Sequence, residues 1–195
     1  MTLQHVLDFL FPPQCGGCET PGTGACERCL PYGAVTHGRL RSLDVSWLAS
    51  YEGNVRHAVL ALKSGRRDVA RSFAQRLCAL VEPGDVLVPV PTTAARRRER
   101  GFDGCRLMAQ TIAHQCGVPV LPHLVQVAGD RQRGRTRDAR LCARGRFAWR
   151  GEPLSGLRVT LLDDVVTTGA TLEDCAAVLR TAGAAVEKAI AVARA

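Results

Sequence analysis

The sequence predicts an α/β protein, in which a mostly parallel sheet is flanked by helices and follows a small cysteine-containing module. Apolar stretches of strand length alternate with stretches of helical periodicity, which is typical of βαβ units. The run at 86–90 is apolar throughout, as in a strand that is buried on both faces. With 195 residues, 46% of them hydrophobic, the chain can form one domain and an appendage.

The expected elements alternate along most of the chain. Strands are predicted at 47–51, 86–90, 118–121, 159–162 and 186–192. Helices are predicted at 55–63 and 71–81, and between 93 and 115 with an interruption near Gly101. We therefore expect an N-terminal module at residues 1–40 and an α/β domain at residues 41–195.

Four cysteines near the N-terminus form two C-x-x-C pairs. The pairs are Cys15 with Cys18 and Cys26 with Cys29, and seven residues separate them. This is the spacing of a closed tetrahedral zinc site, in which four thiolates leave no position for catalysis. Disulfides are the competing interpretation, but residues 1–11 lack the basic start and long apolar stretch of a secretory signal. The sequence thus predicts a structural zinc ion and a reducing, cytoplasmic location.

The other five cysteines form no sequence pairs. They are Cys78, Cys105, Cys116, Cys142 and Cys175. Most have apolar or helical neighbours, where a thiol behaves as a small hydrophobic group. The alternative is a redox-sensing thiol, for which Cys142, among arginines, is the best candidate. No apolar stretch approaches the roughly 20 residues that span a bilayer, so we expect no membrane insertion.

The most informative segment runs from Val159 to Thr171 and reads VTLLDDVVTTGAT. Its start predicts a buried strand, the pair Asp163 and Asp164 marks the carboxyl end of that strand, and helical periodicity resumes after Gly169. A helix start offers unpaired N–H groups to an anion, and glycine allows the backbone to approach it. Ligands of open α/β sheets bind at the carboxyl ends of strands, so both carboxylates should lie beside a bound phosphate. The alternative is an ordinary helix start with solvated acids.

Positive charge is the third feature. The net charge is +8, with 24 arginines against two lysines, and it is concentrated at 96–100 and in a basic flexible loop expected at about 129–150. Basic segments that also contain aromatic side chains favour single-stranded DNA as a partner. The alternative is a solvated face with an arginine bias from a GC-rich genome. The candidate nucleic-acid-binding residues are Arg96, Arg97, Arg98, Arg100, Arg131, Arg133, Arg135 and Phe147.

The segment from Val159 to Thr171 resembles the phosphoribosyl pyrophosphate (PRPP) motif of the type I phosphoribosyltransferases. The resemblance implies that the catalytic acids Asp163 and Asp164 hold the ribose 2′ and 3′ hydroxyls. The residues that it places around the 5′-phosphate are Thr167, Thr168, Gly169, Ala170 and Thr171. In an active transferase, the turn formed by Pro91, Thr92 and Thr93 after the central strand would hold pyrophosphate through the backbone N–H groups that it offers, and Mg²⁺ would bind with PRPP.

The order of motifs from about residue 7 to 191 is similar to that of the ComF family of competence-associated proteins. The four-cysteine module comes first, RRRERGF at 96–102 follows a PVP strand end, and the basic loop ends before DDVVTTGAT. This resemblance implies a type I phosphoribosyltransferase-like domain, a zinc-ribbon-like module and a role in DNA uptake and natural transformation. Asp103 and Gly104 depart from the Asn-Gln that is common in relatives, and Ala143 stands where asparagine is usual.

Three functions stay open at this point. The first is a competence or DNA-utilisation protein that binds PRPP or a related ribose phosphate and single-stranded DNA. The second is an active phosphoribosyltransferase of unknown acceptor base, although His114 and His123 flank a predicted strand and give no positioned general base. The third is a regulatory adaptor that reports PRPP or a nucleotide to a protein partner, such as a DNA-uptake helicase or another competence protein.

Overall fold

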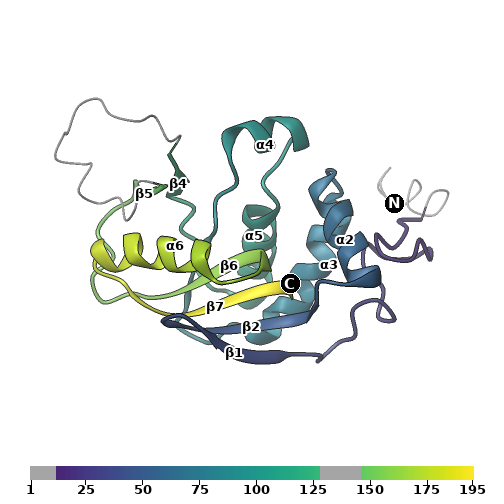
Figure 1. Cartoon of the computed structure of the whole chain (residues 1–195), viewed down its shortest axis with the longest axis horizontal. Coiled ribbons are helices and arrows are strands. Elements are labelled where there is room, and N and C mark those ends of the chain that lie inside the picture. The colour runs from purple at the N-terminus through teal and green to yellow at the C-terminus, as the bar shows by residue number, and fades with distance from the viewer. Residues whose placement is uncertain (1–11, 128–145) are drawn as a thin grey trace.

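The computed structural model describes residues 12–127 and 146–195. Five strands form one sheet in the order β1-β2-β7-β6-β3, and β4 pairs with β5 in a separate hairpin (Figure 1). Strands β2, β7, β6 and β3 are parallel, whereas β1 is antiparallel to β2 at one edge. The strands are β1 Thr36–Leu40, β2 Leu43–Ser50, β3 Val86–Pro89, β4 Leu124–Gln126, β5 Phe147–Trp149, β6 Arg158–Val166 and β7 Ala185–Arg194.

Helices cover both faces of this sheet. Leu161 packs in the hydrophobic cluster that includes α6, while its neighbour Leu162 packs in the cluster that includes α2, α3 and α5. The predicted α/β class with a mostly parallel sheet is therefore confirmed. The helices are α2 Gly53–Lys63, α3 Arg67–Leu77, the 3-10 helix η1 Cys78–Leu80, α4 Ala94–Arg100, α5 Gly104–Cys116 and α6 Ala170–Thr181.

Strand β6 is longer than predicted. On one side it pairs with β3 only as far as Leu162, where the partner is Pro89. On the other side it pairs with β7 as far as Val166. The prediction that the acidic pair marks the end of the strand is therefore wrong for β6 itself, because β7 extends the ladder. Asp163 and Asp164 instead lie inside β6, beyond the end of β3.

The strand predicted at 118–121 is reduced to one parallel bridge, between Val120 and Leu87. Prolines at positions 119 and 122 explain this, because proline has no N–H group to donate to a longer ladder. The carbonyl oxygen of Pro119 still accepts the N–H of Leu87 at 2.9 Å. This segment therefore lies beside β3 without forming a full strand.

Strand β5 lies within the segment that the sequence predicts as a basic loop. Its first residue, Phe147, is 1% exposed, and Trp149 is 9% exposed. Both rings belong to the hydrophobic core, which packs against α6. Phe147 also lines the cleft described below, and its role in nucleic-acid binding stays a prediction, with almost none of the ring exposed for a base to stack on.

The cysteine module and the α/β domain share one hydrophobic core. Ala25 and Leu30 of the module are buried in the same cluster as the apolar side chains of α3. A Cβ atom at Gly24 would lie 2.4 Å from the backbone carbon of Asp68, so only glycine fits there. Strand β1 pairs with β2 in the main sheet. The boundary expected between residues 40 and 41 therefore falls inside a hairpin of that sheet.

Arg76 of α3 forms hydrogen bonds that link the cysteine module to the α/β domain. Its side chain is buried and donates to the carbonyl oxygens of Leu30 (2.7 Å) and Ala25 (2.9 Å), which flank the second cysteine pair. Its guanidinium carbon lies 4.2 Å from the centroid of the Tyr32 ring. Carbonyl dipoles and an aromatic face thus replace water around this charge.

Candidate functional site

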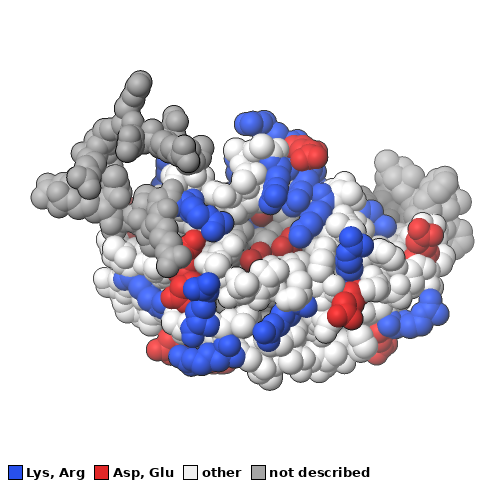
Figure 2. Space-filling view, viewed as in Figure 1, with Lys and Arg blue, Asp and Glu red and all other residues white. Residues whose placement is uncertain are grey.

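A cleft of about 560 Å³ opens at the carboxyl edge of the sheet, beyond the end of β3. Its walls come from the end of α2, the turn after β3, the exposed helix α4, the start of α5 and the second half of β6. Figure 2 shows this face as hollowed, with acidic side chains inside the hollow and basic side chains along its upper rim. The position agrees with the rule for ligand sites in open α/β sheets.

Asp163 and Asp164 line this cleft together. The carboxylate of Asp164 lies 3.5 Å from the Nζ atom of Lys63, the last residue of α2. The Oδ1 atom of Asp163 accepts the N–H of Asp164 at 2.8 Å and lies 3.8 Å from the Sγ atom of Cys105 in α5. The two carboxylates therefore have different environments, one beside an ammonium group and the other beside a buried thiol.

This environment raises the pKa of Asp163 to about 7. Burial is the main cause because it disfavours the charged form, and the negative charge of Asp164 adds to it. Burial and the charge of Asp163 also raise the pKa of Cys105 well above its usual range, so this thiol stays protonated and can donate to Asp163. A carboxyl group that titrates near neutral pH in a polar cleft is typical of a functional site.

The start of α6 lies against the turn between β1 and β2. Gly169 precedes the helix with a φ of 73°, and no side chain of the described residues caps the first N–H groups. A Cβ atom at Gly169 would lie 3.0 Å from the Cβ atom of Leu40, so both the conformation and the close contact require glycine. The Nε atom of Arg41 donates to the carbonyl oxygen of Thr168 at 3.3 Å. Free N–H groups and a guanidinium thus adjoin one another, as an anion site requires.

The residues predicted to contact PRPP fall into two groups. Pro91, Thr92 and Thr171 line the cleft together with the two aspartates. The residues that adjoin the cleft along the chain without forming its walls are Thr167, Thr168, Gly169 and Ala170. Two of these, Thr167 and Thr168, are exposed. The chain therefore brings the acid pair and the start of α6 to one edge of the sheet.

Polar groups of the turn after β3 already form hydrogen bonds to other groups of the protein. The N–H of Thr92 donates to the Oδ2 atom of Asp103 at 3.2 Å, and the Oγ1 atom of Thr93 accepts the N–H of Arg96 at 3.1 Å. Asp103 also caps α5, because its Oδ1 atom accepts the N–H of Arg106 at 3.1 Å. The Asp103 carboxylate thus already accepts the hydrogen bond of the Thr92 N–H, the backbone group that is expected from the sequence to bind pyrophosphate.

Helix α4 projects from the body of the protein, and none of its residues is buried (Figure 1). Arg96 and Arg100, one helical turn apart, line the cleft, whereas Arg97 lines a separate cavity of about 180 Å³. Arg98 is also exposed. The sites predicted at Arg131, Arg133, Arg135, Cys142 and Ala143 lie outside the described residues.

Several side chains at this site have no local sequence pattern that marks them. Lys63, Cys105 and Gln126 line the cleft from α2, α5 and β4, and Arg41 reaches the start of α6 from the β1–β2 turn. Only the tertiary fold brings these elements together. Arg146 also lines the cleft. Its position in the basic segment is the one signal that could have indicated it.

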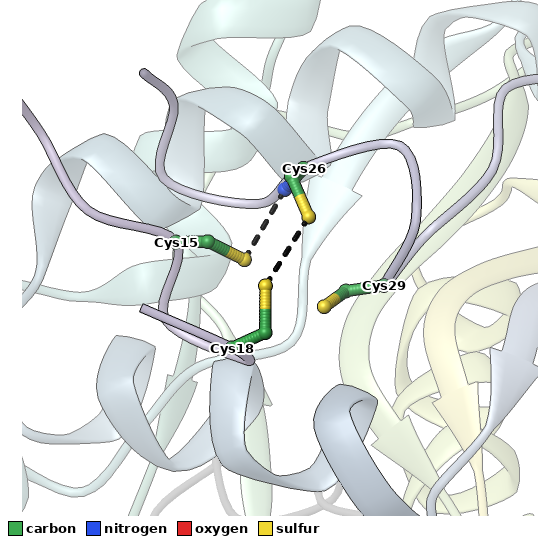
Figure 3. A group of neighbouring side chains, drawn as sticks. All are labelled: Cys15, Cys18, Cys26 and Cys29. Atoms are coloured by element: carbon green, nitrogen blue, oxygen red, sulfur yellow. Dashed lines mark hydrogen bonds between the residues drawn. The ribbon is translucent and has the colours of Figure 1, made fainter. Parts of the chain in front are cut away.

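The four predicted zinc ligands form a second site. The Sγ atoms of Cys15, Cys18, Cys26 and Cys29 all lie within 4.8 Å of one another, and the side chains converge on one centre (Figure 3). Sulfurs about 2.3 Å from a tetrahedral zinc ion lie about 3.8 Å apart. The Sγ atoms of Cys18 and Cys26 are 3.5 Å apart, and all four cysteines are free of disulfides. The donor set therefore fits a zinc ion.

Hydrogen bonds already favour thiolates in the first cysteine pair. The Thr20 hydroxyl and amide lower the pKa of Cys18 to about 5. At Cys15, burial alone would raise the pKa, but N–H groups that include that of Cys26 outweigh it and the pKa is lowered. Burial and neighbouring cysteines raise the pKa of Cys29 instead. A divalent cation would relieve this conflict, because it binds all four groups as thiolates.

The parallel sheet and the acid pair followed by a glycine turn define the class, a phosphoribosyltransferase-like α/β domain with a four-cysteine centre. The chain is 32% identical over 100 residues to competence protein ComFC of Bacillus subtilis, covering 51% of this chain and 40% of that relative. It is 28% identical over 179 residues to DNA utilization protein YhgH of Salmonella typhimurium, covering 89% of this chain and 79% of the relative. These relatives confirm the predicted resemblance to the ComF family. No family model matches the chain.

Solved structures with a similar chain path include two enzymes. Glutamine PRPP amidotransferase of Bacillus subtilis is 25% identical, with a TM-score of 0.44 over 66% of this chain and 26% of the enzyme. Adenine phosphoribosyltransferase of Leishmania tarentolae is 11% identical, with a TM-score of 0.43 over 82% of this chain and 94% of the enzyme. Separately, no helix within residues 12–127 and 146–195 has the length and apolar character to cross a membrane.

Proposed function

We propose that this protein acts in DNA uptake or utilisation and that its cleft binds PRPP or a related ribose phosphate. The observation that carries the proposal is the acid pair Asp163 and Asp164 in a cleft of about 560 Å³, beside the uncapped start of α6. The names of the relatives, a competence protein and a DNA utilization protein, support the wider role. The ligand class follows from the chemistry of the cleft. Carboxylates that can accept hydrogen bonds from sugar hydroxyls lie next to backbone N–H groups that can donate to a phosphate.

Each part of the ligand has a matching group in this arrangement. Carboxylates accept hydrogen bonds from two vicinal hydroxyls, so Asp163 and Asp164 suit a ribose. The free N–H groups at the start of α6 suit its 5′-phosphate. The Nζ atom of Lys63 lies 3.5 Å from the carboxylate of Asp164 and partly neutralises the acid pair, which reduces its repulsion of an anionic ligand. Mg²⁺, where PRPP brings it, would neutralise pyrophosphate oxygens.

The first test is calorimetric titration with ribose 5-phosphate and, separately, with magnesium PRPP. We expect the double variant Asp163→Asn, Asp164→Asn to lose about 100-fold or more in affinity, because two charge-assisted hydrogen bonds are replaced by neutral ones. Asp44→Asn is the matched control, since Asp44 is exposed, pairs with Arg39 of β1 and does not line the cleft. Failure of both ligands to bind the folded wild type would remove the proposal.

We further propose that α4 contributes to the binding of single-stranded DNA. Four of its seven residues are arginines, and none of the seven is buried. Arg97 and Arg98 are the informative pair, since neither lines the cleft that would hold the ribose phosphate. Guanidinium groups on this exposed helix can bind the backbone phosphates of single-stranded DNA.

The double variant Arg97→Ser, Arg98→Ser should weaken binding of an oligothymidylate and reduce the slope of log K against log salt by about 1.4, which is two phosphate contacts. Its affinity for ribose 5-phosphate should stay unchanged. Arg56→Ser, Arg71→Ser removes the same charge from exposed positions on α2 and α3 and serves as the control. Equal DNA affinity and salt slope in the α4 variant and the wild type would exclude α4 from the DNA site.

An active phosphoribosyltransferase is the alternative, and one observation favours it. The pKa of Asp163 is raised to about 7, so this carboxyl can exchange a proton at neutral pH in the cleft. Such an enzyme would release pyrophosphate from PRPP when a nitrogen base is supplied. Screening bases for pyrophosphate release, with Asp163→Asn as the inactive control, separates this alternative from a binding protein.

A further inference from the structure

Asp103 has an unusual place in the cleft. Its carboxylate links the turn after β3 to the start of α5, accepting the N–H of Thr92 with Oδ2 and the N–H of Arg106 with Oδ1. It lines the cleft together with Asp163 and Asp164. No ion pair to Asp103 is present within residues 12–127 and 146–195. Arg96 and Arg100 line the same cleft, but neither forms an ion pair with Asp103, whose two oxygens accept backbone N–H groups instead.

The Thr92 N–H is the group that would receive a second anion. Thr92 follows β3 and lines the same cleft as Asp163, Asp164 and Thr171 of α6, so a ligand anchored at α6 has room in this cleft for a further phosphate near Thr92. Asp103 already occupies this donor as an anionic acceptor would. A carboxylate has no hydrogen to offer a phosphate, whereas an asparagine amide at the same position would have two.

We propose that Asp103 determines the phosphate specificity of the cleft, so that it accepts a ribose with one phosphate and disfavours a ligand with an additional pyrophosphate arm. This inference rests on the proposed ribose-phosphate site and names its ligand class. The pyrophosphate arm would have to displace the Asp103 carboxylate from Thr92 and meet its charge at close range. The monophosphate end, held at α6, meets neither obstacle.

The test compares two ligands on two proteins by calorimetry at fixed free Mg²⁺. The wild type should bind ribose 5-phosphate more tightly than PRPP. Asp103→Asn should bind PRPP about tenfold more tightly than the wild type, because one close like charge is removed, while its affinity for ribose 5-phosphate changes less than about twofold. Asparagine and aspartate cap helices equally well, so α5 should be retained.

Glu99→Gln is the matched control, since it removes one negative charge from the exposed α4 without changing the walls of the cleft. Its two affinities should equal those of the wild type. Asp103→Ser, which keeps a capping oxygen, gives a second measurement if the asparagine variant is not folded. Unchanged or weaker PRPP binding in these variants would overturn the inference, and weaker binding would assign Asp103 to the magnesium of PRPP instead.

The outcome also separates this inference from the site itself. Loss of ribose 5-phosphate binding in Asp163→Asn, Asp164→Asn supports the site whatever the Asp103 variants do. An unaltered ratio of the two affinities in Asp103→Asn, with the site intact, overturns the specificity role alone. Binding of PRPP but not of ribose 5-phosphate to the wild type overturns the specificity role alone, and failure of both ligands to bind overturns both.

Discussion

Removal of metal from the four-cysteine centre is expected to lower the melting temperature of the whole protein by more than about 10 °C. Structural zinc contributes about 10–16 kcal/mol to the folding of small zinc-binding peptides, so its loss outweighs most single contacts. Here the module shares a core with α3 through Ala25 and Leu30. Loss of the module should therefore expose apolar surface of the α/β domain as well.

The measurement combines metal analysis with thermal unfolding. The purified protein should contain about one zinc ion per chain, and a strong chelator or the variant Cys15→Ser should remove it and lower the melting temperature. Cys116→Ser is the matched control, because Cys116 is an exposed cysteine outside the cluster and should leave both readings unchanged. A metal-free protein with the melting temperature of the untreated protein would show that the cysteines do not form a structural centre.

Asp163→Asn is expected to stabilise the protein, although it damages the proposed ligand site. The pKa of Asp163 is raised from 3.8 to about 7 by burial and by Asp164, so the folded state holds this proton more tightly than the unfolded state does. The stability of the wild type should therefore fall, through this group, as the pH rises from about 4 to about 7. Asparagine carries no charge and avoids this loss.

The difference between variant and wild type should consequently depend on pH. At pH 8 the variant should gain about 4 kcal/mol in the free energy of unfolding, or about 8–16 °C in melting temperature, and near pH 4 most of this gain should be lost. Thermal unfolding at both pH values measures this. Asp44→Asn, at an exposed ion pair, should show little change at either pH. A constant difference across this range would contradict a raised pKa at Asp163.

Features that depend on neighbouring residues in the chain were predictable. The junction of β6 with α6 is marked by a change of hydrophobic period around Gly169, and the helix does begin at Ala170. The two C-x-x-C pairs likewise reach one centre through local turns and a short connection. Both predictions needed only nearby sequence, so the tertiary fold had little opportunity to alter them.

Features that depend on distant contacts were not predictable. Phe147 looks like an exposed aromatic in a basic segment, yet β5 pairs with β4 and buries the ring against α6. Lys63 gains its role only because the end of α2 meets β6. The acids Asp163 and Asp164 lie within a strand because β7, which comes later in the chain, extends the ladder. Hydrophobic period alone contains no information about such partners.

The position of Arg76 has a consequence for any attempt to redesign the protein without metal. Its buried guanidinium is satisfied by carbonyl oxygens on either side of the second cysteine pair, and those oxygens point to it only while that pair is folded. If replacing the four cysteines with apolar residues unfolds this pair, the buried guanidinium keeps only the carbonyl oxygen of Ser72, in α3 itself, of the three acceptors that it now has. A metal-free version would also need a neutral residue at position 76 and a new partner for the carbonyl groups that Arg76 now satisfies.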